Sequence, residues 1–314
     1  MSALRRVIVR GMRELAWFTG FATYEARRSG VRWVMMLHGV GTDGLSADVL
    51  AENLIWLQRN FRIVKLGEMV ESLESGRAPD ARGEIALTFD DGLRNQALQA
   101  YPVLRSLGLP ATIFVCPGLI DEGSWMWNHD ARARLSRLSP EELLRFADLV
   151  AGNQLSGRAV VEAMKFIPAE RRRELHKQIQ QATPDFVPTP DERTSSDLMT
   201  WEELKGLDPE LITIGSHTVS HPILPELDEV ELAFEIQASR EMLEERLGRQ
   251  VDLFCYPNGA SDVRAHRIVA RVYRAAVLTR EGRVGTAVDR FAIPRLALEG
   301  PCKDLAWRML RCRS

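Results

Sequence analysis

Apolar segments that suit buried strands alternate along this chain with amphipathic segments that suit helices. This alternation predicts parallel strands, because a parallel connection needs a crossover long enough to hold a helix. We therefore expect an α/β fold, either a doubly wound sheet or a barrel. The expected strands are 31–40, 61–66, 83–90, 111–116, 211–216, 251–257 and 273–279, and the clearest helices are 46–60, 94–108, 228–247 and 262–271. Ser46 is expected to cap the first of these helices, and Gly108 to end the second.

The alternation is interrupted between about residues 118 and 197. Helical patterns such as SPEELLRFADLV and AERRRELHKQIQQA predict a mostly helical insertion. Its last part, TPDFVPTPDERTSSD at 183–197, is rich in proline and charge and is predicted to be a loop. We expect one main domain over 31–314 that carries this insertion.

The first 30 residues form a separate amphipathic segment. It contains no apolar stretch near the roughly 20 residues of a membrane span. Its pattern is typical of a surface helix packed on the domain, and it also suits a helix lying in an anionic membrane interface. On a helix, Leu4, Val7, Ile8, Gly11, Leu15 and Phe18 share one face, and Arg5, Arg6, Arg10 and Arg13 lie opposite.

The charges of the chain nearly cancel, since 41 lysine and arginine residues and 43 aspartate and glutamate residues give a formal net charge of −2. No overall field favours nucleic acid, and we expect no such partner. The four cysteines form no CxxC pair, and no small-residue cleavage site follows an apolar segment near the start. We expect free thiols in a cytoplasmic protein, with peripheral contact at the inner membrane as an open alternative. In an exported chain the four cysteines could instead pair.

The segment IALTFDDGL, residues 85–93, places Asp90 and Asp91 side by side at the end of an apolar run. Loops at the carboxyl ends of parallel strands converge on one rim, where sites form. Both carboxylates reach one pocket only if the chain bends, and Gly92 permits that bend. The alternative is that one aspartate only caps a helix beginning near Leu93.

A second motif, IGSHTVSHPIL, places His217 and His221 four residues apart, just past another expected strand. Two imidazoles and a carboxylate are common ligands of a catalytic zinc ion, and three protein ligands leave one position open. Pro222 disfavours the α region for His221, so a loop is expected here. Hydrogen-bonded loop histidines are the alternative.

A third segment, LFCYPNGA at 253–260, predicts a strand that runs into a tight turn. A backbone amide in such a turn can point into the rim and donate a hydrogen bond to a developing oxyanion. Most turns of this kind only reverse the chain, so this segment indicates little when taken alone.

Together the three motifs resemble those of the NodB-homology polysaccharide deacetylases, carbohydrate esterase family 4. TFDDG matches the first motif of that family, SHTVSH matches the second, and FCYPNG is similar to the third. The resemblance covers roughly 31–117 and 198–298. It implies a deformed (β/α)7-type barrel, the NodB homology fold, and it implies site residues that can be assigned position by position.

By this resemblance, Asp91, His217 and His221 are the ligands of a divalent metal, usually zinc. Asp90 resembles the catalytic base that takes a proton from the attacking water. The backbone N–H of Asn258 is similar to the donor that stabilises the tetrahedral oxyanion. One aspartate would then hold the metal and its neighbour would take the proton.

The sequence also departs from the family pattern. Many members carry an arginine in the third motif that orients the base, and here Cys255 stands in that place. Arg295 could pair with Asp90 instead, or it could be a solvated surface arginine. No histidine follows His266, so the carboxyl-terminal acid of many relatives is absent. In MMLHGV, His38 resembles the histidine that ends the amino-terminal strand of the poly-N-acetylglucosamine deacetylase branch, where it acts as the general acid; a hydrogen-bonded core histidine is the alternative.

Other candidate residues are less informative. His129, His176 and His266 follow no expected strand, and we expect them at the surface. Trp125 and Trp127 in SWMWNHD suit either stacking on sugar rings or the core of the insertion.

The expected activity is hydrolysis of an N-acetyl amide on an amino sugar, in a glycan or a lipid-linked glycan precursor, with zinc as the expected metal. One alternative is a deformylase or amidase acting on a lipid-linked sugar or a small amide. Another is an inactive carbohydrate-binding scaffold, against which the intact aspartates and histidines argue.

Overall fold

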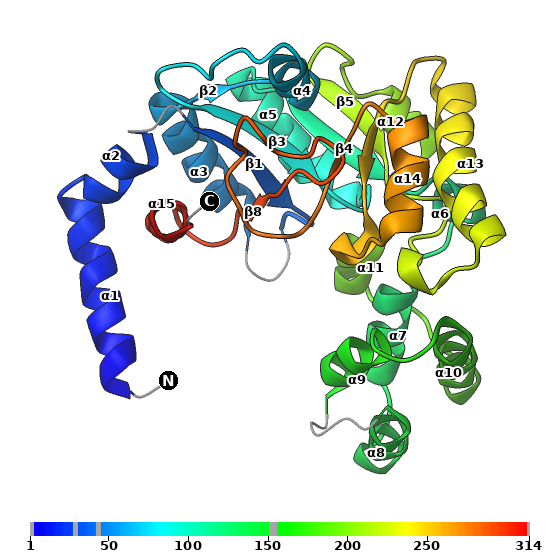
Figure 1. Ribbon diagram of the computed structural model, residues 1–314. Coiled ribbons are helices and arrows are strands. Elements are labelled where there is room, and N and C mark those ends of the chain that lie inside the picture. Colours follow the sequence, from blue (N-terminus) through cyan, green and yellow to red (C-terminus); the bar gives the residue numbers. More distant parts are fainter. Residues whose placement is uncertain (1–2, 28–30, 42–44, 151–155, 313–314) are drawn as a thin grey trace.

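The computed structural model describes residues 3–27, 31–41, 45–150 and 156–312. In this part of the chain, parallel strands form a curled sheet in the order β7-β6-β5-β4-β3-β1-β8, and β2 also pairs with β3 (Figure 1). The sheet is a deformed barrel, as expected. The strands are β1 (Arg32–Leu37), β2 (Arg62–Ile63), β3 (Glu84–Phe89), β4 (Ala111–Val115), β5 (Ile212–Ser216), β6 (Leu253–Cys255), β7 (Ala275–Val277) and β8 (Leu296–Ala297).

The strands form where the sequence is apolar without interruption, because a parallel sheet covered on both faces buries every side chain. All six residues of β3 are buried. Strand β8 was not expected, since two residues are too few to give a sequence pattern. It pairs with β1, and a single parallel bridge joins Val277 to Ile293, just ahead of β8.

Helices cover the outside of the barrel much as the alternation predicted. Ser46 caps α3 by accepting a hydrogen bond from the Val49 N–H, and Gly108 ends α5 with a φ of 62°. A short π-helical turn over Gln96–Ala100 precedes α5. The covering helices are α3 (Ala47–Asn60), α4 (Leu66–Glu74), α5 (Tyr101–Leu107), α12 (Trp201–Lys205), α13 (Glu229–Leu247), α14 (Val263–Val272) and α15 (Cys302–Arg311).

Most of the insertion, described over 127–150 and 156–196, builds a helical layer below the barrel in Figure 1, with its own apolar core that includes Leu135, Val160 and Leu175. The loop predicted over 183–197 was wrong in part, because Pro190–Ser196 forms a helix. Thr189 and Glu192 make a capping box there, and this local satisfaction of amide groups outweighs the unfavourable composition. The helices of this layer are α7 (Trp127–Leu135), α8 (Pro140–Leu149), α9 (Gly157–Met164), α10 (Ala169–Ala182) and α11 (Pro190–Ser196). The helix before them, α6 (Pro117–Glu122), packs against α13.

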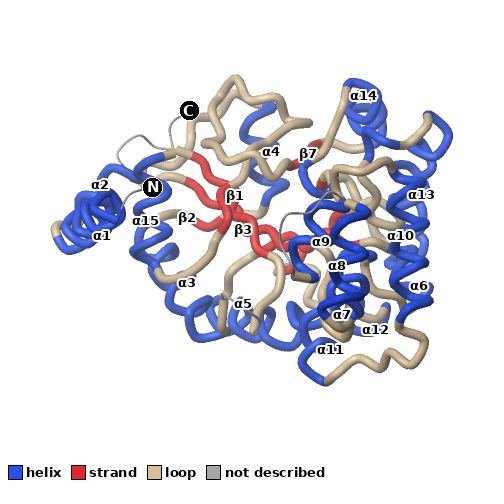
Figure 2. The backbone as a smooth tube through the Cα atoms, turned by 90° about the horizontal axis from the view of Figure 1, so that it is seen from below, coloured by secondary structure: helices blue, strands red, loops and turns tan. Residues whose placement is uncertain are grey.

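The amino-terminal segment forms two helices, α1 (Ala3–Phe18) and α2 (Phe21–Arg27), beside α15. Figure 2 shows them at one side of the barrel, across from the insertion. No helix in the described residues is both long and apolar enough to cross a bilayer. The four cysteines are free thiols, as expected.

Candidate metal centre and active site

The three sequence motifs meet at the carboxyl rim of the barrel because strand registers align their ends. Leu37 of β1 pairs with Phe89 of β3, so His38 and Asp90 begin the rim together. Val115 of β4 pairs with Ser216 of β5, and the next residue, His217, donates its backbone N–H to the Val115 carbonyl oxygen at 2.9 Å.

The backbone leaves regular geometry at each motif. Among the described residues, the non-glycine positions with positive φ are Asp91, Thr218, His221 and Asn258, with φ of 78°, 70°, 60° and 55°. Such conformations are strained and cluster at functional sites. Gly92 follows Asp91 with φ of 68°, and an added Cβ there would lie 2.7 Å from Val115 Cγ1. The bend allows two adjacent aspartates to serve one site.

Asp91, His217 and His221 form a buried cluster with the donor set of a metal site. Asp91 Oδ1 lies 3.5 Å from the Nε2 atoms of both histidines. One ligand atom from each residue lies within 4.8 Å of the other two. A carboxylate and two imidazoles with room for further ligands fit a catalytic divalent cation such as zinc.

The electrostatics of this cluster suit a bound cation. Burial alone would raise the pKa of Asp91, but the interaction with His217 and the charges of His38 and His221 lower it well below its ordinary value. Burial, together with the neighbouring His217, lowers the pKa of His221 to about 3. At neutral pH the carboxylate is therefore charged and the His221 imidazole is neutral, as metal ligands must be.

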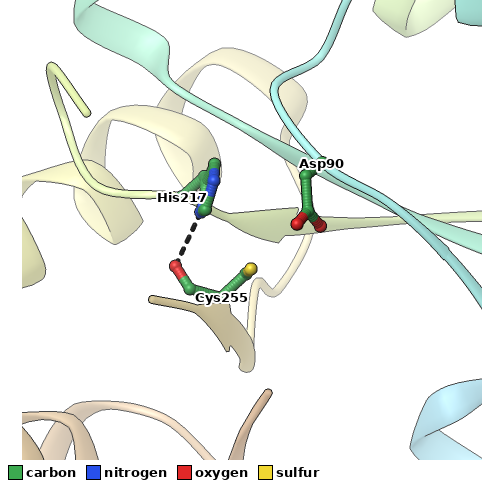
Figure 3. A group of neighbouring side chains, drawn as sticks. All are labelled: Asp90, His217 and Cys255. Atoms are coloured by element: carbon green, nitrogen blue, oxygen red, sulfur yellow. Dashed lines mark hydrogen bonds between the residues drawn. The ribbon is translucent and has the colours of Figure 1, made fainter. Parts of the chain in front are cut away.

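A second group of possible ligands, Asp90, His217 and Cys255, shares one histidine with the first (Figure 3). His217 Nδ1 lies 2.7 Å from the Cys255 carbonyl oxygen. A carbonyl only accepts, so Nδ1 carries a hydrogen and Nε2, which faces Asp91, is the nitrogen that would bind a metal. Burial alone would lower the pKa of His217, but its interactions with Cys255 and Asp91 raise it well above the ordinary value, so a metal would displace the Nε2 proton on binding. Burial raises the pKa of the Cys255 thiol, which disfavours the thiolate, and the Arg295 guanidinium lies 3.2 Å from its sulfur. The Asp91 cluster is therefore the better metal site.

Asp90 is held by Arg295 rather than by a residue of the third motif. Arg295 is fully buried, and its Nη1 and Nη2 atoms donate to the two carboxylate oxygens at 2.7 and 2.6 Å. It also donates to the Leu278 carbonyl oxygen at 2.8 Å and to Thr88 Oγ1 at 3.0 Å. The small side chain of Cys255 lies against the guanidinium, where a second arginine would clash and repel.

This pairing fixes the charge of Asp90. Burial alone would raise the pKa of its carboxyl, but the charge and hydrogen bonds of Arg295 lower it below the ordinary value. Asp90 is ionised at neutral pH and carries the lone pairs that a proton acceptor needs. The bidentate geometry also fixes the direction of those lone pairs.

His38 is on the rim and not in the core. Its side chain is 51% exposed, and its Nε2 lies 3.8 Å from Asp90 Oδ2. The side-chain amide of Gln96, in the π-helical turn, donates to the backbone carbonyl oxygens of His38 and Asp90 at 3.1 and 2.5 Å. Gln96 therefore positions the two rim residues relative to each other.

The histidine loop has a further support that sequence reasoning missed. Glu235 of α13 accepts from the backbone N–H and the hydroxyl of Ser220 at 2.9 and 2.5 Å. The loop is thus held between the two histidines. No sequence signal marked Glu235 or Gln96, because each is one polar residue within a helix and its partner is known only from the fold.

The structure overturns the expectation that His129 lies at the surface. This residue of α7 is partly buried, with Nδ1 3.1 Å from Ser196 Oγ, and burial lowers its pKa to about 4. Asp91 and His38 are close enough for their charges to act on it. His176 is also tied down, with Nε2 2.7 Å from Asp130 Oδ2. His129 is partly buried because the insertion folds back over the rim, and His176 because α10 packs on α7 within the insertion; no local pattern indicates either contact.

Asn258 and the two tryptophans take the following places. Asn258 is exposed in a single 3-10 turn, Pro257–Gly259, directly after β6. Trp127 packs against the core of the insertion, with the Arg172 guanidinium 5.3 Å from its ring centroid. Trp125 is partly buried, and its Nε1 donates to Asp197 Oδ1 at 2.8 Å.

A family model described as polysaccharide deacetylase matches residues 77–276, which is more than half of the chain. The chain belongs to the polysaccharide deacetylase family. The matched region contains the two aspartates, the two histidines and the third motif, whereas His38 and Arg295 lie outside it. No curated protein matches this chain.

Solved structures show the same fold at low sequence identity. Streptococcus pyogenes deacetylase PplD, in complex with acetate, is 17% identical with a TM-score of 0.62 and covers 89% of this chain and 98% of its own. IcaB from Ammonifex degensii is 18% identical with a TM-score of 0.59, covering 89% and 97%. A de-N-acetylase from Aggregatibacter actinomycetemcomitans is 15% identical with a TM-score of 0.53, covering 85% and 95%.

Proposed function

We propose that this polysaccharide deacetylase hydrolyses the N-acetyl amide of an amino sugar, N-acetylglucosamine or a close relative, in a glycan or a glycan precursor. The observation that carries the proposal is that the two adjacent aspartates face different partners. Asp91 faces two imidazoles, and Asp90 faces Arg295 and the rim residue His38. A metal-assisted hydrolase needs a ligand and a base side by side, and this arrangement provides both.

Asp91, His217 and His221 would hold the metal, for which zinc is our proposal. When bound, the ion supplies Lewis-acid polarisation of the acyl carbonyl and lowers the pKa of water. Asp90, held ionised by Arg295, takes the proton of the attacking water. The backbone N–H of Asn258 donates to the oxygen on which negative charge develops.

His38 completes the proposed reaction by protonating the amine that leaves. Its imidazole is half exposed, so it can reach a sugar bound at the rim, and it lies near the residue that takes up the first proton. It would replace the carboxyl-terminal histidine that the chain lacks. We infer that the protein belongs with the poly-N-acetylglucosamine deacetylase branch, and the resemblance of MMLHGV supports this inference.

The test is whether purified protein releases acetate from short N-acetylglucosamine oligomers. The metal content of the protein is measured, and activity is followed after a chelator is added and again after zinc restores the metal. Asp90→Asn is expected to retain metal and to lose activity by at least about a hundredfold. Asp121→Asn, which changes an exposed aspartate paired with Arg246, is the matched control and should keep full activity. Wild-type turnover by Asp90→Asn would show that the base is assigned wrongly. Release of formate from formylated sugars, with none of acetate, would favour the deformylase alternative.

The role of His38 has its own test. His38→Gln is expected to lower amide hydrolysis by about a hundredfold or more, since general acid catalysis contributes about 10²–10⁴. Hydrolysis of an activated acetate ester should change little, because its phenolate leaving group needs no proton. Equal losses on both substrates would contradict the assignment of His38 as the acid.

A further inference from the structure

Helices α1 and α2 expose a continuous set of large apolar side chains that the barrel leaves uncovered. A face of this kind on a protein surface marks an interaction site. The exposed fractions range from 51% to 81%, for Ile8, Met12, Leu15, Phe18, Phe21 and Tyr24.

The helix is attached to the barrel through its other side. Arg13 Nη1 lies 2.6 Å from Asp304 Oδ1, and Lys303 Nζ lies 2.8 Å from Glu14 Oε1. Ala16 is buried against α15. The expectation that this segment packs on the domain was incomplete. The helix packs through Ala16, Trp17 and the two ion pairs, and the exposed apolar stripe takes no part in that contact.

The charge of these helices differs from that of the rest of the chain. Between residues 3 and 27 there are five arginines and two glutamates, although the whole chain has a formal net charge of −2. Arg10 is exposed one turn from Glu14. Because the two helices carry a net positive charge, two copies packed side by side in a symmetric dimer would repel each other, whereas an anionic surface would attract them.

Three aromatic side chains are exposed at the end of α1 and on α2, namely Phe18, Phe21 and Tyr24. A shallow groove of about 640 Å³ adjoins α1 and α2, with Trp17, Tyr24, Arg27 and Trp56 among its lining residues. Rings with one polar atom favour the headgroup level of a bilayer, and arginine binds phosphate there.

We propose that α1 and α2 bind the surface of an anionic lipid bilayer through this face. The apolar side chains would enter the region between headgroups and acyl chains, and the exposed Arg10 would contact lipid phosphates. The barrel stays outside the bilayer and remains attached through the Arg13 and Glu14 ion pairs. The proposal stands independently of the deacetylase chemistry, since none of these residues belongs to the rim.

The test is co-sedimentation of the full chain with phosphatidylcholine vesicles, with and without phosphatidylglycerol. We expect binding that requires phosphatidylglycerol and weakens with salt. The double variant Leu15→Ser, Phe18→Ser should lower the partition coefficient at least about tenfold, since both side chains lose their apolar burial. Arg10→Gln should lower it about fivefold, the loss of one charge near an anionic surface.

The matched control is Phe166→Ser with Val187→Ser, which removes two large apolar side chains exposed by 88% and 73% on the insertion. This control should bind vesicles like the wild type. Both double variants should keep the melting temperature of the wild type. The proposal would be overturned if the wild type did not bind vesicles, or if the two double variants weakened vesicle binding equally. A stable dimer that the Leu15 and Phe18 changes dissociate, without vesicle binding, would overturn it in favour of a second copy.

Discussion

Replacing Arg295 by methionine tests whether the buried guanidinium keeps Asp90 charged and in place. Arg295 is fully buried, and both Nη atoms donate to Asp90. Methionine is apolar and fills much of the same volume, so the change leaves a buried carboxylate without its partner. Breaking a buried pair in this way costs about 3–5 kcal/mol, a large part of the about 5–15 kcal/mol that stabilises a typical protein.

The loss has a characteristic pH dependence. In the wild type, folding lowers the Asp90 pKa against the effect of burial, so Asp90 stabilises the fold above its unfolded pKa and this contribution is lost as pH falls through the folded value. In Arg295→Met, burial raises that pKa, so stability is instead lost as pH rises through the raised value. The free-energy difference between the two proteins should be largest at neutral pH and should shrink on acidification.

The assay is urea unfolding followed by tryptophan fluorescence at neutral and mildly acidic pH. Arg137→Met is the matched control, since Arg137 is 40% exposed and pairs with Glu192 at 2.6 Å. Arg137→Met should lower the free energy of unfolding by less than about 1 kcal/mol, because exposed ion pairs contribute little. Arg295→Lys keeps the charge and loses the bidentate fork, so we expect it to lower the free energy of unfolding by an intermediate amount. This variant keeps the test informative if Arg295→Met does not fold. The reasoning would be refuted if Arg295→Met lowered the free energy of unfolding no more than Arg137→Met does. It would also be refuted if the loss in Arg295→Met did not change with pH.

Three further predictions concern the metal and the backbone. Zinc at about a hundred times its dissociation constant should stabilise the chelated protein by about 2.7 kcal/mol, and thermal unfolding of His217→Ala should show no such gain. Gly259→Ala should destabilise the protein by about 1–3 kcal/mol in urea unfolding. The reason is that φ is +67° and the new Cβ would lie 2.0 Å from Thr279 Oγ1. The control is Gly11→Ala, whose Cβ would meet no atom within 4 Å and which should not destabilise the protein. Thr189→Ala should cost about 1 kcal/mol in the same assay through loss of the α11 cap, and an unchanged midpoint would contradict that role for the capping box.

Features that depend on neighbours in the chain were predictable. Continuous apolar runs and helix signals indicated the parallel α/β fold, since burial on both faces and capping are local properties of a segment. Ser46 and Gly108 cap and end helices as expected. The paired aspartates and histidines were recognisable because each motif directly follows a strand, and parallel strands share one rim.

The tertiary structure alone decided which distant groups meet. Asp90 and Arg295 are 205 residues apart in sequence, and the pairing of β8 with β1, together with backbone hydrogen bonds to the segment after β7, brings the arginine to the base. His129 lies near the site because the insertion folds back over the rim. The outward direction of the apolar stripe of α1 likewise follows from the ion pairs and the apolar contacts between α1 and α15. Amphipathic spacing defines a helix face, but the contacts that cover or expose it come from parts of the chain that no local pattern connects.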